Sequence, residues 1–100
     1  MDERELTERE LAELLDETAK AHHKAFESGD GFDPDWPLWY AGYVQAHLWD
    51  RFGRRTTRSA LTYMLVSAER AYEASPVKDR IEWLDFYAAW ILAELERESS

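Results

Sequence analysis

The sequence predicts an all-α protein, a compact bundle of four mostly antiparallel helices in one domain. Apolar residues recur at helical spacing over four long stretches. Only four glycines and three prolines interrupt them, which leaves too few turns for a β-sandwich. One hundred residues can bury one hydrophobic core. We expect residues 1–6 to fray, and no internal repeat is apparent. The expected helices are 7–28, 36–52, 57–74 and 76–97.

The first helix has clear signals at both ends. Thr7 followed by Glu10 has the spacing of a capping box, and Leu6 and Leu11 stand at the positions of a hydrophobic staple. Gly29 is the expected stop. The residues expected on its inner face are Leu11, Leu14, Leu15, Thr18, His22, Ala25 and Phe26.

The second helix follows the longest irregular stretch of the chain. Asp33 with Pro34, or Asp35, can start it, because aspartate caps helices and proline suits the first turn. Gly53 is the expected end, and Gly42 allows a neighbour to approach closely. The expected core stripe is Leu38, Ala41, Gln45, Leu48, Trp49 and Phe52.

The third and fourth helices are expected to start at hydroxyl-bearing or acidic residues. Thr56 or Thr57 caps the third helix, and Ser75 with Pro76 opens the fourth, unless its first turn begins near Asp79. The expected core residues are Leu61, Met64, Leu65, Ala68 and Tyr72 in the third helix, and Ile81, Leu84, Ala88, Ile91, Leu92 and Leu95 in the fourth.

The formal net charge of −9 is unevenly placed along the chain. Residues 1–35 carry twelve acidic and four basic side chains, whereas residues 36–75 carry three acidic and five basic ones. Such a molecule repels a phosphate backbone, so no nucleic-acid partner is expected. The absence of cysteine excludes disulfides and thiolate chemistry. No signal sequence or apolar stretch of about 18 residues is found, and we expect a cytoplasmic protein without a membrane partner.

The second helix carries an aromatic face whose rings have polar tips. Trp36, Tyr40, Tyr43 and His47 follow at i, i+4, i+7 and i+11, with Trp39 on the flank. Such rings are typical of ligand pockets and interfaces, and in an acidic bundle they suit a cationic or aromatic molecule. The alternative is that this face packs against the first helix.

The three histidines extend the candidate ligand site. His22 is expected to point inward from the first helix, and His23 lies about 100° further round. Together with His47 they could form a metal site with a carboxylate, but the Glu-x-x-His and HExxH patterns are missing. A core histidine is the favoured interpretation of His22, and we predict no metal, cofactor or catalytic residues.

The fourth helix has aromatic residues beyond those that one core face needs. Trp83, Tyr87 and Trp90 follow at i, i+4 and i+7, with Phe86 beside them. Left exposed, three such rings would form a patch of about 450–750 Å², which matches or exceeds the largest patch of about 300–600 Å² on a typical monomer. These four residues are therefore candidates for a homodimer interface or a contact with a foreign partner, unless the other helices cover them.

Arginines gather between the second and third helices, where Arg54, Arg55 and Arg58 are interleaved with Thr57. The cations complement the dipole at the end of one helix, and the start of the next offers free N–H groups. These residues are a weak candidate for binding an anion, including an acidic segment of a second copy. A solvated turn is the default interpretation.

The stretch DPDWPLWYAGYVQAHL, with HHKAFE before it, resembles short uncharacterised bacterial helical proteins that carry a DxDWPxWYAxY segment. The resemblance covers about residues 20–50 and implies a bacterial cytosolic protein. It brings no activity, cofactor or partner. The residues to which it draws attention are His22, His23, Trp36, Pro37, Trp39, Tyr40 and Tyr43.

Taken together, these features favour a non-enzymatic, self-associating helical protein, with a dimer expected, that binds a protein partner. The alternative is a bundle that binds an aromatic or cationic small molecule, with or without catalysis, through the aromatic and histidine face of the second helix. The two hypotheses differ in what the excess aromatic rings surround. An interaction protein places them in a flat contact, and a ligand-binding protein places them around a cavity.

Overall fold

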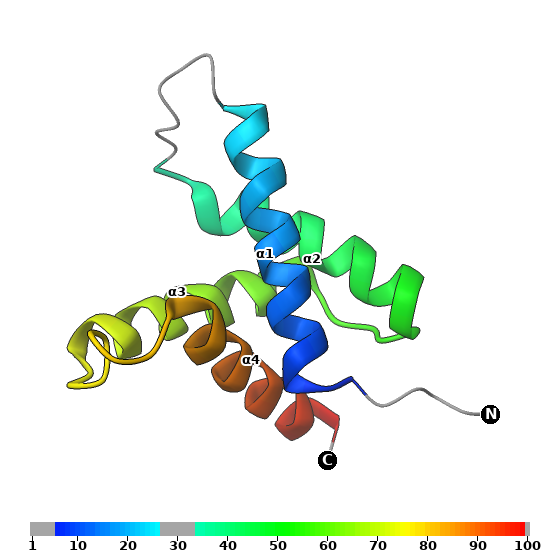
Figure 1. The fold of residues 1–100 in the computed structure, drawn as a ribbon. Helices are drawn as coiled ribbons and strands as arrows, with labels where there is room; N and C mark the ends of the chain where they lie inside the picture. Colours follow the sequence, from blue (N-terminus) through cyan, green and yellow to red (C-terminus); the bar gives the residue numbers. More distant parts are fainter. Residues whose placement is uncertain (1–5, 27–33, 100) are drawn as a thin grey trace.

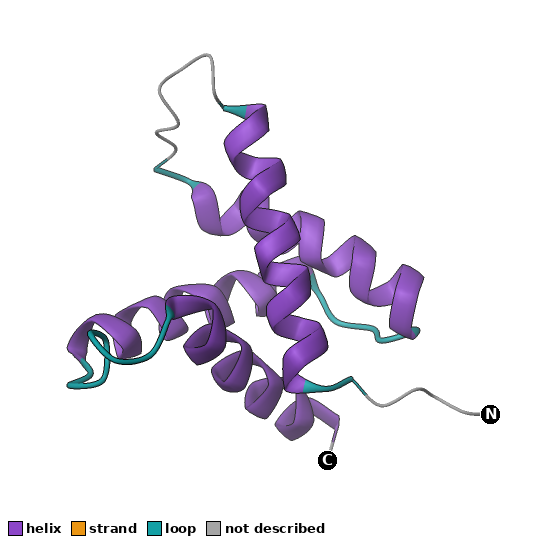
Figure 2. Cartoon of the chain, viewed as in Figure 1, coloured by secondary structure: helices purple, strands orange, loops and turns teal. Residues whose placement is uncertain are grey.

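The four helices of the protein pack against one another in a closed cycle. A computed structural model describes residues 6–26 and 34–99, with α1 at Glu8–Ala25, α2 at Trp36–Phe52, α3 at Arg58–Ala74 and α4 at Trp83–Ser99. Each helix contacts the next one along the chain, and α4 returns to contact α1. Figures 1 and 2 show α1 crossing in front of α2. The predicted all-α four-helix bundle is confirmed.

Three of the predicted helix ends form at their expected capping residues. The capping box is present, because the Thr7 hydroxyl accepts from the Glu10 N–H at 3.1 Å and the Glu10 carboxylate accepts from the Thr7 N–H at the same distance. Thr57 caps α3 by accepting from the Ala60 N–H at 2.9 Å. Gly53 ends α2 with a φ of +63°, a left-handed conformation that favours glycine.

The start of α4 differs from the expectation. The helix begins at Trp83 and not at residue 76, and turns occupy the residues between. The hydroxyl of Tyr72 donates to the carbonyl oxygens of Lys78 at 2.8 Å and Ile81 at 2.7 Å. These bonds tie the connection back onto α3, so the chain cannot run straight from Pro76 into a helix.

The core is built from one stripe on each helix, and the stripe predicted for α2 is confirmed at Ala41 and Leu48 but wrong at Leu38 and Trp49. Its buried residues are Tyr40, Ala41, Val44 and Leu48. Leu38 and Trp49, which were expected inside, are exposed. Because α2 is apolar around most of its circumference, periodicity alone could not choose the buried side.

Smaller differences occur at the ends of the other stripes. Ile81 is 41% exposed and lies before α4, and Ala25 is exposed at the end of α1. Leu6 is buried in the core although it was expected to fray. The expectations for residues 1–5 and 27–33, which include Gly29 and Asp33, lie outside the described residues.

The structure overturns the expectation that the chain has no internal repeat. The order of buried and exposed residues along α1 recurs along α3 fifty positions later, and that of α2 recurs almost unchanged along α4 forty-seven positions later. Most aligned outer residues differ, which conceals the repeat in the sequence. The aligned positions that keep the same residue are Thr7/Thr57, Leu11/Leu61, Leu15/Leu65, Ala21/Ala71, Trp36/Trp83, Tyr40/Tyr87, Ala41/Ala88, Ala46/Ala93 and Leu48/Leu95.

The ring contacts repeat with the helices. Trp36 meets Tyr40 edge to face at 5.1 Å between ring centroids, and Trp83 meets Tyr87 in the same way at 5.2 Å. The contact of α1 with α4 corresponds to that of α3 with α2. The molecule therefore consists of two similar helical hairpins related by a pseudo-two-fold axis. No helix within the described residues is long and apolar enough to cross a lipid bilayer.

The side chain of Trp90 in α4 leads to a prediction about stability. Among the residues that the structure describes, the buried indole N–H of Trp90 has no hydrogen-bond partner. Since an unsatisfied buried donor is unfavourable, we expect Trp90→Phe to cost less than about 1 kcal/mol of unfolding free energy, or to stabilise the protein. The matched control is the next residue, the fully buried Ile91, where Ile91→Ala should cost about 2–5 kcal/mol. Urea unfolding measures both, and equal losses would contradict the prediction.

Candidate functional site

The rings of α2 that were predicted to form a ligand site make one connected series with α1. His22 meets Trp39 edge to face at 5.1 Å, Trp39 stacks on Tyr43 at 5.7 Å, and Tyr43 stacks on His47 at 4.2 Å between ring centroids. We call these four residues the aromatic ladder. All four are half-buried, so each ring has one part against the core and another at the surface.

Two further candidate residues, Tyr40 and Trp36, pack on the inner side of the ladder. A third, His23, is not part of these ring contacts. Tyr40 is buried beneath it, with its ring 5.3 Å from that of His22, and Trp36 closes over Tyr40. Phe26 adds a ring contact to His22 at 4.7 Å. His23 is exposed on α1, and the structure does not bring it into these ring contacts. Six of the seven predicted ligand-site residues thus converge.

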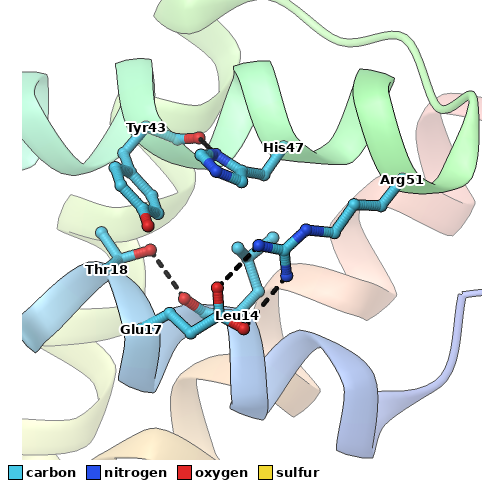
Figure 3. Close-up of polar contacts among 6 residues, drawn as sticks. All are labelled: Leu14, Glu17, Thr18, Tyr43, His47 and Arg51. Atoms are coloured by element: carbon cyan, nitrogen blue, oxygen red, sulfur yellow. Dashed lines mark hydrogen bonds and ion pairs between the residues drawn. The ribbon is translucent and has the colours of Figure 1, made fainter. Parts of the chain in front are cut away.

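Polar contacts fix the end of the ladder that lies near the centre of α1. Figure 3 shows Arg51 of α2 donating two hydrogen bonds to the carboxylate of Glu17 on α1, at 3.0 and 2.7 Å. This guanidinium holds the pKa of the Glu17 carboxyl below its usual value. His47 Nδ1 lies 2.9 Å from the carbonyl oxygen of Tyr43, which sets the orientation of the imidazole.

The ladder offers stacking surfaces and ring nitrogens, but not the group of ligands that a metal centre needs. Within residues 6–26 and 34–99, no group of three histidine or acidic side chains is placed to hold a metal ion. The buried Thr18 beside the ladder donates its hydroxyl to the Leu14 carbonyl at 2.7 Å. That hydroxyl is thereby satisfied within α1.

The aromatic residues of α4 pack inside the monomer. Tyr87 is buried, and Trp83, Phe86 and Trp90 are half-buried against the core. Burial raises the pKa of the Tyr87 phenol, and the carboxylates of Glu69 and Glu73 act in the same direction. The exposed patch that would favour a homodimer interface on this helix is therefore not found.

The arginine candidates bind parts of their own chain and do not converge on one anion site. Arg54 donates to the Leu95 carbonyl at the end of α4, and Arg58 donates to the Leu38 carbonyl at 3.3 and 3.2 Å. Arg55 lies over the ring of Trp49 at 4.7 Å from the centroid. The Thr57 hydroxyl serves as the cap of α3.

Exposed large side chains and arginines instead mark an outer surface of α2, α3 and their connection that the sequence analysis missed. We call it the α2–α3 face, and it consists of Leu38, Trp49, Arg55, Arg58 and Tyr63. Leu38, Trp49 and Tyr63 are 47%, 53% and 68% exposed, and both arginines are exposed. Leu38 and Trp49 were predicted to lie in the core. Their spacing of eleven residues does put them on one line along the helix, but that line is exposed.

The connection between α2 and α3 lies along this face and shapes it. Figure 1 shows the connection running back beneath α2, where the Gln45 side chain donates to the Thr56 carbonyl at 3.0 Å. Gly42 leaves room for the Arg58 guanidinium, whose Nε lies 3.5 Å from where a Cβ would be. Two shallow hollows result. One of about 320 Å³ lies beside Trp49 and Arg55, and one of about 360 Å³ lies between Leu38 and Arg58.

A larger and acidic groove lies between α1 and the start of α4. It has a volume of about 860 Å³, and Ala12 and Leu84 supply its apolar part. Arg9 is the basic residue of its lining. The acidic residues that line it are Glu8, Glu13, Asp16, Glu17, Glu82 and Asp85.

Comparison with known proteins gave no match. No family model fits the chain, and no curated protein or solved structure is significantly similar to it. The resemblance of residues 20–50 to a bacterial group therefore stays a prediction.

The role of Trp36 can be tested by truncation. Its ring packs on Tyr40 and the core, so Trp36→Ala should lower the unfolding free energy by about 1.5–3 kcal/mol, the transfer free energy of a large side chain. His23→Ala, at an exposed position of α1, should change it by less than about 0.5 kcal/mol. Thermal melts measure both. A Trp36→Ala melt within a degree or two of wild type would contradict the packing role and favour a ligand-binding one.

The buried tyrosines predict a sensitivity to alkali. Burial raises the pKa of Tyr40 and of Tyr87 above the unfolded value of about 10. The folded state therefore holds these protons more tightly, and stability is present below about pH 10 and lost as the pH rises further. Urea midpoints should fall between about pH 9 and pH 11, and fall less in Tyr40→Phe. An equal fall in that variant would show that Tyr40 does not contribute.

Proposed function

We propose that this protein is a non-enzymatic binding protein that self-associates and acts by contacting another protein through its α2–α3 face. One observation carries the proposal. Leu38, Trp49 and Tyr63 are large apolar side chains that the fold leaves exposed on neighbouring helices. Tryptophan, tyrosine and arginine are the residues that most often dominate binding at protein interfaces, and all three occur on this face.

The arginines of the face are already held in place before any partner arrives. Arg58 is fixed to the Leu38 carbonyl, and Arg55 lies against Trp49. A guanidinium has five N–H donors, and the contact of Arg58 with the carbonyl uses two of them. Since side chains that are ordered in advance lose less entropy on binding, this arrangement favours association with an acidic and partly apolar surface.

A second function has support from the aromatic ladder. Because six predicted ligand-site residues meet there, binding of a cationic or aromatic small molecule is the alternative proposal. A site of this kind is not packed to capacity without its ligand, so truncating Trp36 would cost it little stability. The melting experiment on Trp36 therefore separates a packed cluster from an open site.

Self-association tests the main proposal directly. At about 150 mM salt, where the Debye length is about 8 Å, the mean mass of the wild type should rise with concentration up to about 1 mM. Replacing the exposed rings with Trp49→Ser and Tyr63→Ser should remove this rise. Sedimentation velocity or light scattering measures the mass.

The matched control is Ile81→Ser, because Ile81 is also exposed but lies in the connection before α4. It should leave the association unchanged. A wild type that stays monomeric at about 1 mM would contradict self-association. A ring variant that associates as strongly as the wild type would contradict the assignment of the α2–α3 face.

A further inference from the structure

The pseudo-two-fold repeat relates the acidic groove to the α2–α3 face. Each residue that lines the hollow between Leu38 and Arg58 has a counterpart in the lining of the groove. The counterpart of Arg58 is Glu8, and both are the first residues of their helices. The aligned pairs are Asp85/Leu38, Glu8/Arg58, Arg9/Ser59 and Ala12/Thr62.

The repeat keeps its core and changes charge at several aligned positions of its outer surface. Tyr40, Ala41 and Leu48 recur unchanged as the buried residues of α4. On the outside, acidic residues of the α1–α4 side align with apolar or basic residues of the α2–α3 side. The pairs are Glu8/Arg58, Glu13/Tyr63, Asp16/Val66, Asp85/Leu38, Glu96/Trp49 and Glu98/Arg51. Two surfaces at equivalent positions have thus become complementary in charge.

We propose that the partner of the α2–α3 face is the acidic groove of a second copy, so that copies join head to tail. This inference rests on the proposed function and names its partner. The apolar part of the groove, at Ala12 and Leu84, receives the exposed apolar side chains of the face. The carboxylates of Glu8, Glu82 and Asp85 around it pair with Arg55 and Arg58, since carboxylate and guanidinium form two parallel hydrogen bonds, whereas Glu17 is held by Arg51 of its own chain.

The net charge of −9 on each copy opposes this contact at long range. At about 0.15 M salt the Debye length is about 8 Å, so charges on the distant parts of two copies are largely screened. Pairs in direct contact are screened much less. Association is therefore governed by the local match between the face and the groove, and it should weaken when salt is lowered to about 10 mM.

The geometry of the contact sets the kind of assembly. The face is built on α2 and α3, and the groove on α1 and α4, so one copy presents both at different places. A contact between two different surfaces is heterologous, and each pair of copies keeps one free face and one free groove. The assembly therefore continues beyond two chains until it closes into a ring or remains open.

Two charge-reversed variants test this arrangement. The face variant carries Arg55→Glu and Arg58→Glu, and the groove variant carries Glu13→Lys and Asp85→Lys. Each should associate with itself at least tenfold more weakly than the wild type. Mixed in equal amounts, they should associate again into mixed complexes, because the intact groove of the first meets the intact face of the second, and the reversed, acidic face also matches the charge of the reversed groove. Light scattering after size-exclusion chromatography measures the masses, and circular dichroism checks that each variant is folded.

The outcomes separate this inference from the proposed function. If the face variant is monomeric but the groove variant associates like the wild type, the face meets its own copy symmetrically and the head-to-tail inference is overturned, while the proposed function stands. If both variants associate like the wild type, both are overturned. A folded pair of variants that gives no complex on mixing also overturns the head-to-tail contact.

Discussion

The close packing of α2 and α4 on their neighbours is the constraint on which the rest of the structure depends. Ala41 and Ala88 are completely buried, and their small side chains let each of these helices approach the bundle closely. Tyr40 and Tyr87, one residue before them, fill the space at the hairpin ends. Once these positions are fixed, the rotation of each helix about its axis is fixed too, and every other side chain is directed inward, sideways or outward.

The aromatic clusters are consequences of that rotation. Residues beside the buried stripe of α2 come to the flank, where Trp39 and Tyr43 stack and meet His22. The same rotation of α4 brings Phe86 and Trp90 to the equivalent flank, where they also stack. The first flank ends at His47 and the Glu17–Arg51 pair, and the second ends at Glu94, which pairs with Arg97. The aromatic excess is therefore largely a product of packing.

The outer surfaces were free to change because the core does not involve them. Two hairpins with nearly the same interior carry an acidic groove on one side and an apolar, basic face on the other. Arg58 donates to the Leu38 carbonyl and Arg55 lies against the Trp49 ring, so the arginines of the face are held by the protein itself and do not form a separate anion site. An interaction between complementary surfaces is the function that this division of the molecule supports best.

The sequence by itself determined the four helices, the Thr7, Thr57 and Gly53 ends, and the inner stripes of α1 and α3, because these follow from local hydrogen bonding and helical periodicity. It also identified all four residues of the aromatic ladder. Only the tertiary structure decided which side of α2 is buried, since that helix is apolar almost all round. It also decided that Leu38 and Trp49 remain exposed and that the two halves repeat. These properties depend on which neighbouring helix covers each surface. The periodicity of one segment does not identify a covering helix that lies far away in the chain.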